Sequence, residues 1–513
     1  MATLPVEQGT QSIRTAEKAF TLFQLDELLF FGDAKEKHSL KLKDPRRRLI
    51  HQGFLGYKSK QNDCRVFLLD HALIVTELKV VGGRERLRVV HHPIPIGLLQ
   101  VSLHQTRLTL FGYIPLPVCE VRYQLRFSSL GKRFNNNKTL TLFSSSVEAA
   151  NTWIETIRAQ RDVNQQSSEF NVLTLGQDII RRNGEIRVNC VALYGKDQTI
   201  VYGTGDGVYV QLQNGQPRKA IDLADVQRID VLEDLSLLVI LAERSVLTFP
   251  LETLEMEEPT KHMNRITIAS QTSFFKTGTY KDRTMLCTVK ASSTSSTIKI
   301  LESVVSLPTS SPNQRGQTSS PDKDKLRPFR EFRLAKGLYS VQFLKTKLCV
   351  ASTTGFDIVD LETLDTQALL DPTDQKLDFV HHIEPRPLRV YCIGGEFLVC
   401  YREFAFYANS NGKKSDKDVV IYWEGTPIAC ALHYPYIVAF SPNFVEIRHV
   451  DDGSCVQVIQ ERGVRCLYAK GSPAEDLAYH LSRRRENNIL VSFSNQVAFL
   501  TPILSPTDRR HSK

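Results

Sequence analysis

Short runs of apolar residues, separated by turn-forming residues, dominate the chain from residue 49 onward. The first such runs predict strands that pair across short polar turns. They lie at residues 49–58, 64–76, 92–99 and 138–143. Residues 146–157 follow a different period, because Ala149, Ala150, Trp153, Ile154 and Ile157 recur at the spacing of one helix face. The pattern therefore predicts a β-rich unit over residues 49–161 that ends in one amphipathic helix, with Trp153 in its core.

A second pattern repeats from residue 188 to residue 505. Each repeat reads as a strand, a turn, an apolar strand, a short turn and another strand, and about seven repeats fit the length. Repetition on this scale is typical of a β-propeller, whose blades are small sheets that cannot bury their own faces. The stretch 162–187 is polar and is predicted to be a linker. Residues 292–325 are rich in Ser and Thr and contain no aromatic residue, which predicts a mobile excursion between strands.

The most apolar hairpin of the repeat region lies at residues 396–407, where two apolar runs flank Arg402 and Glu403. Both faces of these strands are apolar, so they need a sheet packed on either side. Residues 409–412 read Asn-Ser-Asn-Gly, a group that tolerates positive φ and turns the chain. We expect Phe404 and Phe406 to be buried between blades, with Ala405 facing the neighbouring blade. The predicted fold class is therefore mainly β, with a small sandwich followed by a propeller of about seven blades.

The first 48 residues carry one helical stripe, with apolar residues at positions 22, 25, 28 and 29. A basic boundary follows at Arg46, Arg47 and Arg48, directly after Pro45. Either a solvated linker or a contact with anionic lipid explains these three arginines.

Composition narrows the class of protein. Of 513 residues, 42% are hydrophobic and 24% are charged, as in globular proteins. No run of about 18 apolar residues predicts a membrane span, and the first ten residues do not resemble a secretion signal. The ten cysteines form no Cys-x-x-Cys pair, which predicts reduced thiols without a metal. The net charge of +9 is compatible with an anionic membrane surface, and no motif indicates nucleic acid. A cytoplasmic protein is expected.

No catalytic or cofactor motif is present. The glycines at positions 203, 205 and 207 lead into a strand, whereas a phosphate-binding loop leads into a helix. The adjacent pairs His91-His92 and His381-His382 have no acidic or cysteine partner at metal-ligand spacing. We therefore predict no catalytic residues, no cofactor and no metal.

Several motifs resemble known families. The run Cys400-Tyr401-Arg402-Glu403-Phe404-Ala405-Phe406-Tyr407, with the Asn-Gly turn after it, resembles a signature of the citron homology domain, and residues 348–364 match it independently. Residues 67–73 and 93–99 resemble the pleckstrin homology domain of fungal Rho exchange factors. Residues 16–30 are similar to the segment that leaves the last helix of a Dbl homology exchange domain in those proteins. The catalytic helices that should precede this segment are absent from the chain.

The resemblance implies the C-terminal part of a fungal guanine-nucleotide exchange factor for a Rho-type GTPase, acting in cell-wall integrity and actin polarity. It also implies peripheral recruitment of this cytoplasmic protein to the plasma membrane at growth sites. Without exchange helices, the chain is expected to be a regulatory and targeting module and not itself an enzyme. Its expected partners are a Rho-type small GTPase, bound directly or indirectly, other signalling proteins at the propeller, and an anionic membrane. Residues 1–48 are then the remnant that follows a missing exchange domain, and residues 506–513 are a tail.

The candidate membrane site is Lys58, Lys60 and Arg65, because cations around the first loop of pleckstrin homology domains hold lipid phosphates. Lipid-binding members carry Arg-x-Arg after this loop, whereas this chain reads Arg65-Val66-Phe67. The expected binding is therefore weak and salt-sensitive, with Arg46, Arg47 and Arg48 as secondary candidates. Solvated loop charges are the alternative explanation.

Two other functions remain open at this stage. One is a non-catalytic scaffold that binds a Rho GTPase or its regulators. The other is a membrane-trafficking tether, since citron homology domains also occur in tethering subunits. A tether is expected to continue into helical repeats after its propeller, and the sequence ends shortly after residue 505.

Overall fold

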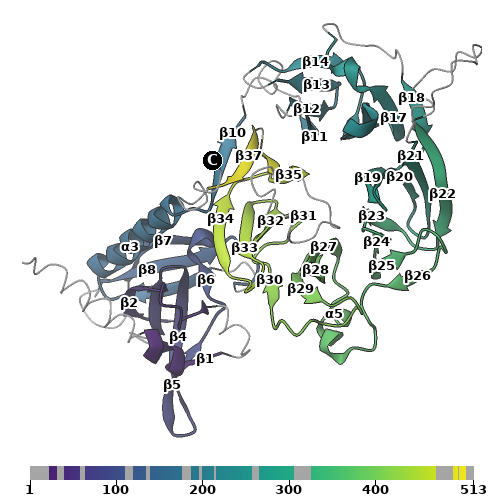
Figure 1. Ribbon diagram of the computed structural model, residues 1–513. Helices are drawn as coiled ribbons and strands as arrows, with labels where there is room; N and C mark the ends of the chain where they lie inside the picture. The colour runs from purple at the N-terminus through teal and green to yellow at the C-terminus, as the bar shows by residue number, and fades with distance from the viewer. Residues whose placement is uncertain are drawn as a thin grey trace, which may run out of the picture.

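The structure is a computed structural model, and it contains two β-rich domains joined side by side (Figure 1). It describes residues 22–31, 40–57, 64–109, 119–134, 139–175, 187–195, 199–212, 215–256, 265–304, 325–469, 489–494 and 496–503. Among these residues, no helix is long and apolar enough to cross a membrane.

The smaller domain is built from two sheets and one helix. The first sheet contains β2 (Leu49–Leu55), β3 (Cys64–Leu69), β4 (Ala72–Val81), β5 (Arg84–Val89) and β6 (Ile94–Pro95). The second contains β7 (Leu99–Thr109), β8 (Cys119–Ser129) and β9 (Leu140–Ser144). The helix α3 (Val147–Gln166) begins at Ser146, whose hydroxyl accepts a hydrogen bond from the Ala149 N–H. Trp153 is 3% exposed and packs edge-on against His51, so the prediction of a core tryptophan is confirmed.

The N-terminal stripe covers the outer face of the first sheet. A helix over residues 22–28 leads into β1 (Leu29–Phe30), which pairs in parallel with β5. Leu22, Leu25 and Leu29 are buried against this sheet in one cluster with Phe67, Ile74 and Leu87. Leu28, also part of the predicted stripe, is 40% exposed.

The larger domain is a propeller of seven four-stranded antiparallel sheets among the described residues, which we number as blades 1–7. Blade 1 is β11 (Val188–Tyr194), β12 (Thr199–Thr204), β13 (Val208–Gln211) and β14 (Arg218–Ile221). Blade 2 is β15 (Val226–Leu232), β16 (Leu237–Ala242), β17 (Ser245–Pro250) and β18 (Ile266–Ala269). Blade 3 is β19 (Phe274–Tyr280), β20 (Arg283–Ala291), β21 (Ser296–Ser303) and β22 (Leu326–Leu334). Blade 4 is β23 (Leu338–Phe343), β24 (Leu348–Ser352), β25 (Gly355–Val359) and β26 (Thr366–Ala368).

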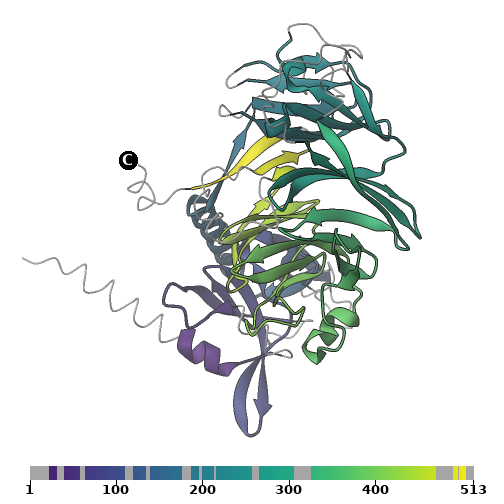
Figure 2. The same ribbon diagram turned by 45° about the vertical axis from the view of Figure 1, so that its right-hand side comes forward.

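The remaining blades complete the ring, which is visible in Figures 1 and 2. Blade 5 is β27 (Pro387–Ile393), β28 (Glu396–Tyr401), β29 (Phe404–Ala408) and β30 (Val420–Tyr422), preceded by the short helix α5 (Asp378–His381). Blade 6 is β31 (Ala429–His433), β32 (Tyr436–Ser441), β33 (Phe444–His449) and β34 (Cys455–Gln460). Blade 7 is β35 (Arg465–Ala469), β36 (Ile489–Phe493), β37 (Gln496–Pro502) and β10 (Phe170–Thr174).

The apolar hairpin of blade 5 lies between its two neighbours, as its sequence predicts. Phe404 and Phe406 share a cluster with residues of blade 4, including Phe356 and Ile358. Ala405 lies on the opposite face, in a cluster that includes Leu432 and Ile437 of blade 6. Phe404, Ala405 and Phe406 are at most 1% exposed, so the prediction for these three residues is confirmed.

Two predicted boundaries are wrong. Residues 170–174 lie in the predicted linker, but they form β10, the outermost strand of blade 7, so the first strand of the propeller in chain order closes its last blade. Only Phe170 of this strand is buried, which is too weak an alternation to recognise in the sequence. Residues 296–303 lie in the predicted excursion, but they form β21, in which the buried Ile298 and Ile300 alternate with the half-buried Thr297 and Lys299. The many serines around this strand make its alternation of buried and half-buried positions difficult to recognise in the sequence.

Candidate functional site

The predicted lipid site is only partly described. Lys58 and Lys60 lie outside the described residues. Arg65 lies on β3, where its Nη2 atom is 3.1 Å from Gln52 Oε1. Its guanidinium lies over the rings of Phe54 and Phe67, 5.6 and 5.2 Å from their centroids. Phe67 therefore stands where lipid-binding members carry their second arginine, and its ring packs against the guanidinium of Arg65. Arg65 forms no ion pair with a carboxylate in the described part of the chain.

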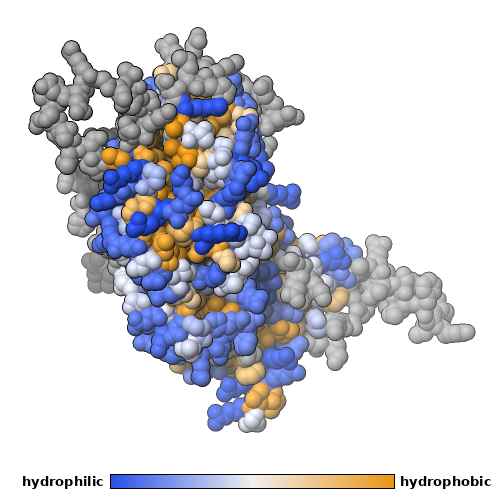
Figure 3. Space-filling model, turned by 90° about the vertical axis from the view of Figure 1, so that its right-hand side faces the viewer, coloured by the Kyte–Doolittle hydropathy of each residue, from blue (hydrophilic) through white to orange (hydrophobic). Residues whose placement is uncertain are grey.

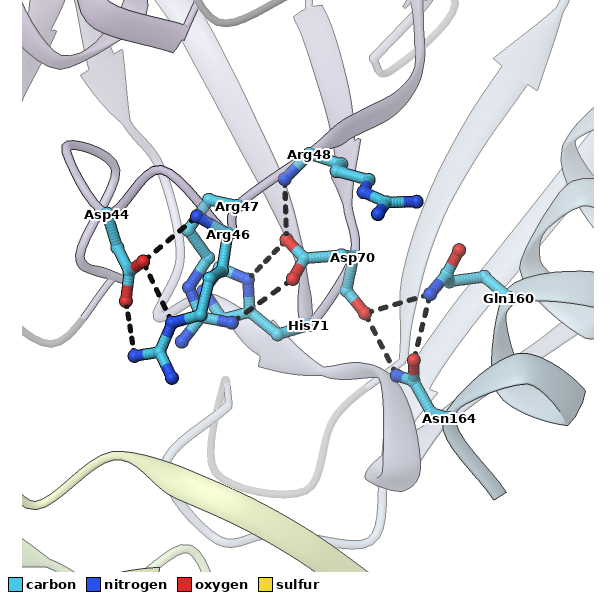
Figure 4. A network of polar contacts seen from close by, with 8 residues as sticks. All are labelled: Asp44, Arg46, Arg47, Arg48, Asp70, His71, Gln160 and Asn164. Atoms are coloured by element: carbon cyan, nitrogen blue, oxygen red, sulfur yellow. Dashed lines mark hydrogen bonds and ion pairs between the residues drawn. The ribbon is translucent and has the colours of Figure 1, made fainter. Parts of the chain in front are cut away.

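Of the three secondary candidates, two are committed to ion pairs within the domain (Figure 4). Arg46 binds Asp44 through Nε and Nη2, with an Nη2–Oδ2 distance of 2.8 Å. Arg47 Nη1 lies 3.1 Å from Asp70 Oδ2, while the N–H of Arg48 donates to the other oxygen of Asp70. The Arg48 guanidinium extends away from Asp70.

Asp70 is the centre of this network. His71 Nδ1 lies 3.1 Å from the carboxylate of Asp70. The backbone carbonyl of Asp70 accepts hydrogen bonds from the side chains of Gln160 and Asn164 of α3 (Figure 4). Burial alone would raise the pKa of Asp70, but the hydrogen bond from His71 and the contacts from Arg48 and Arg47 lower the pKa on balance. The arrangement ties the basic segment to the sheet and to the end of α3. We therefore assign Arg47 a structural role.

A buried polar cluster lies between the two domains, at a surface we call the domain seam. The seam comprises residues 92–97 and 130–133 of the small domain and residues 422–424, 448 and 455–460 of the propeller. Glu424, which is 2% exposed, is its centre. Its Oε1 atom lies 3.1 Å from His92 Nε2, 3.6 Å from Arg133 Nη1 and 3.7 Å from Arg448 Nη2. Its backbone carbonyl accepts a 2.7 Å hydrogen bond from the Lys132 N–H.

The charge of Glu424 is stabilised by both domains. Burial alone would raise the pKa of its carboxyl, but the hydrogen bond and charge of His92, with the charges of Arg133 and Arg448, hold the pKa below the ordinary value. Arg448 also binds the fully buried Glu446, and Arg133 stacks over Tyr422 at 5.3 Å. A buried carboxylate with these partners loses much of its compensation if the domains separate.

Two glycines allow the domains to approach closely. A Cβ atom at Gly97 would lie 2.8 Å from Cβ of Val458, and one at Gly131 would lie 3.1 Å from Oε2 of Glu424. The carbonyl of Gly97 accepts a hydrogen bond from Gln460 Nε2. The two domains are therefore fitted to each other at the level of single backbone atoms.

A cavity of about 620 Å³ lies beside the seam. Both domains line it, with Arg47, Arg161 and His71 from the small domain and Glu424 and Arg448 from the propeller among the lining residues. No cluster of three His, Cys, Asp or Glu residues within the described ranges could hold a metal ion. The sequence analysis missed the whole seam, because its two sides lie far apart in the chain, as with the 332 residues between His92 and Glu424, and no local motif marks them.

The comparisons with known proteins agree with these two domains. The family profile of the pleckstrin homology domain matches residues 49–111, and that of the CNH (citron homology) domain matches residues 196–470, more than half of the chain. The chain therefore contains a pleckstrin homology domain and belongs to the CNH domain family.

The similar proteins include exchange factors from two yeasts. Rho1 guanine nucleotide exchange factor 1 of Schizosaccharomyces pombe is 33% identical over 95% of this chain and 38% of its own length. RHO1 GDP-GTP exchange protein 2 of Saccharomyces cerevisiae is 27% identical over 84% of this chain and 34% of its own length. A solved structure, the AfRom2 CNH domain, is 32% identical, with a TM-score of 0.54 over 66% of this chain and all of that one. The chain is thus homologous to fungal Rho1 exchange factors and spans between a third and two fifths of the length of these two.

Proposed function

We propose that this chain is the regulatory and targeting module of a Rho GTPase exchange factor. In this proposal the pleckstrin homology domain contacts an anionic membrane and the propeller binds signalling proteins, including a Rho-type GTPase directly or indirectly. The process served is cell-wall integrity and actin polarity. The similarity to a Rho1 exchange factor over 95% of the chain, covering both domains, is the observation that carries the proposal.

The domain seam supports a role for the two domains together. Glu424 and Gly97 each contact the opposite domain, so a partner held by the propeller takes a fixed orientation relative to a membrane-bound pleckstrin homology domain. Such positioning reduces the orientational freedom that a GTPase and its regulators lose on assembly. This is how a module without exchange helices contributes to exchange.

A nucleotide-release assay tests the catalytic side of the proposal. We expect the purified chain not to accelerate release of a fluorescent nucleotide from a Rho GTPase, because the family profiles match only domains that perform no exchange. Substantial acceleration by the chain alone would overturn this. A pull-down with the GTPase in its nucleotide-free, GDP and GTP states tests binding separately. Capture without acceleration favours the scaffold function.

Vesicle binding tests the targeting side. We expect association with vesicles that contain phosphatidylserine, falling as salt shortens the Debye length to roughly 8 Å at 0.15 M. Replacing Lys58, Lys60 and Arg65 with alanine should weaken it. Arg47→Ala should instead lower the stability of the domain, since Arg47 pairs with Asp70. Absence of any binding to anionic vesicles would contradict membrane targeting.

A further inference from the structure

The hairpin of β4 and β5 projects away from both domains (Figures 1 and 2). On one side β4 pairs with β3 only as far as Glu77, and on the other side β5 pairs with β1 only at Leu87 and Arg88. Beyond these rungs, the described strands pair only with each other, through Lys79–Arg86, Val80–Glu85 and Val81–Arg84. Gly82 and Gly83 form the turn at positive φ. No packing within the described chain accounts for the length of this hairpin.

The register gives the hairpin one apolar and one basic face. Residues directly opposite each other in an antiparallel ladder point to the same side, and successive residues point to opposite sides. Leu78 and Val80 therefore share one face, on which they are 58% and 71% exposed, with the buried Leu87 and the exposed Glu85 directly opposite them. The other face carries Lys79, Arg84, Arg86 and Arg88, together with Glu77 and the 45% exposed Val81.

The four cations of this face have no partner within the described residues. None of them forms an ion pair or a side-chain hydrogen bond with another described residue, in contrast to Arg46 and Arg47, which bind Asp44 and Asp70. The hairpin has only two carboxylates, Glu77 and Glu85, against these four cations. Figure 3 shows apolar side chains gathered at the lower end of the molecule, where the hairpin projects, with hydrophilic side chains beside them.

The apolar face continues into the sheet. Phe54 lies opposite Arg65, and Arg65 lies opposite Thr76, so these residues share the face of Leu78 and Val80. Phe54 is 58% exposed, with the Arg65 guanidinium stacked over its ring. Exposed apolar residues bordered by uncommitted cations are the pattern of an element that lies in the interface of an anionic bilayer.

Building on the membrane targeting proposed above, we propose that the β4–β5 hairpin is a membrane-inserting element. Leu78, Val80 and Phe54 enter the boundary between headgroups and acyl chains of an anionic bilayer. Lys79, Arg84, Arg86 and Arg88 extend their aliphatic stems along that boundary and place their charges at lipid phosphates. A bilayer fits better than a protein pocket, because the apolar residues follow one face of a ribbon that stands clear of the body.

The first test compares hairpin variants with matched substitutions elsewhere, using vesicles of phosphatidylcholine with and without phosphatidylserine. Arg84→Gln with Arg86→Gln should weaken binding to anionic vesicles by about 30-fold, from the usual contribution of a cation near such a surface. Arg158→Gln with Lys345→Gln removes the same charge from exposed positions outside the hairpin and should have little effect.

Leu78→Asp with Val80→Asp should weaken binding at least tenfold, because it replaces the apolar residues of the hairpin with carboxylates. Leu212→Asp with Val163→Asp, at sites that are 61% and 54% exposed, should not weaken binding.

A reporter distinguishes insertion from surface attraction. Both native tryptophans are buried, Trp153 at 3% and Trp423 at 0% exposure. A Val80→Trp variant therefore carries the only exposed indole of the described chain. Its emission should shift to the blue on adding anionic vesicles and should be quenched by lipids brominated on their acyl chains. The unsubstituted chain serves as the control and should show neither change.

The outcomes separate this inference from the function on which it rests. If the unsubstituted chain fails to bind anionic vesicles, membrane targeting fails, and the hairpin proposal fails with it. If that chain binds but the hairpin variants bind equally well, or the Val80→Trp indole is not quenched, only the hairpin proposal is overturned. Loss of GTPase capture by the hairpin variants, with vesicle binding unchanged, would make the hairpin a protein contact and would also overturn it.

Discussion

His92 Nε2 lies 3.1 Å from Oε1 of Glu424, and this contact joins the pleckstrin homology domain to the propeller across 332 residues of sequence. The side chains are 9% and 3% exposed, so solvent screens the contact little. Arg133 approaches the same carboxylate from the small domain and Arg448 from the propeller. The carboxylate of Glu424 is therefore held by cationic side chains of both domains.

Removing the Glu424 carboxylate should loosen the seam. Breaking a buried ion pair at one partner typically costs about 3–5 kcal/mol, because the remaining charges stay buried without compensation. We expect Glu424→Ala to increase hydrogen exchange at residues 130–134 and 455–460. Glu302→Ala is the control, since Glu302 is also buried and binds Arg283 and Arg327, all within blade 3. Unchanged protection at the seam in Glu424→Ala would show that contacts other than the Glu424 carboxylate hold the domains together.

A side chain at Gly97 should force the domains apart. In Gly97→Val the new Cβ would fall 2.8 Å from Cβ of Val458, closer than real Cβ contacts. The expected result is a larger radius of gyration in small-angle X-ray scattering. Gly205→Val is the matched control, because a Cβ there meets no atom within 4 Å. Adding Val458→Gly to Gly97→Val should restore the compact form, and failure to do so would place the effect elsewhere.

Truncating Phe406 should destabilise the propeller and leave the other domain folded. Phe406 is 0% exposed, and replacing a buried Phe with Ala costs about 3–5 kcal/mol from lost transfer energy and the cavity that remains. Phe406→Ala should therefore lower the Tm of the propeller. Leu212→Ala, at a 61% exposed position, should leave it unchanged. If Phe406→Ala instead keeps the Tm and loses a partner, this strand is a docking surface.

Lys276 on β19 should make propeller stability depend on pH. Burial, with repulsion from Arg228 and Arg389, lowers the pKa of its ammonium to about 7. Because its pKa in the unfolded chain is higher, at about 10.4, the unfolded chain binds this proton more readily. The depressed pKa of Lys276 therefore lowers the free energy of unfolding of the propeller by its full amount below pH 7, and this destabilisation decreases as the pH rises toward 10.

Lys276→Met should therefore raise the Tm of the propeller more at pH 6.5 than at pH 9.5, as measured by thermal unfolding of both proteins at both values. Lys299→Met, a substitution on β21 of the same blade, controls for loss of a lysine as such. A gain that is the same at both pH values would show that packing and not charge explains it.

Local periodicity determined much of the fold by itself. Phe404-Ala405-Phe406 places apolar side chains on both faces of one strand, which indicates packing on both sides, and the repetition of short strands over residues 188–505 indicates a propeller. Trp153 was likewise predicted from its position on one helix face. These conclusions hold because burial of apolar surface depends on which residues share a face, and neighbouring positions in sequence fix that.

The tertiary structure decided the features that depend on residues far apart in the chain. The β10 strand shows one buried residue, Phe170, and only its pairing with β37 identifies it as part of blade 7. Glu424 has no motif, and its role comes from His92 and Arg133, which the fold brings within reach. The basic face of the β4–β5 hairpin required the register that opposes Lys79 to Arg86. Sequence patterns encode which side of an element is apolar, but the partner of a charge is set by the packing of whole domains.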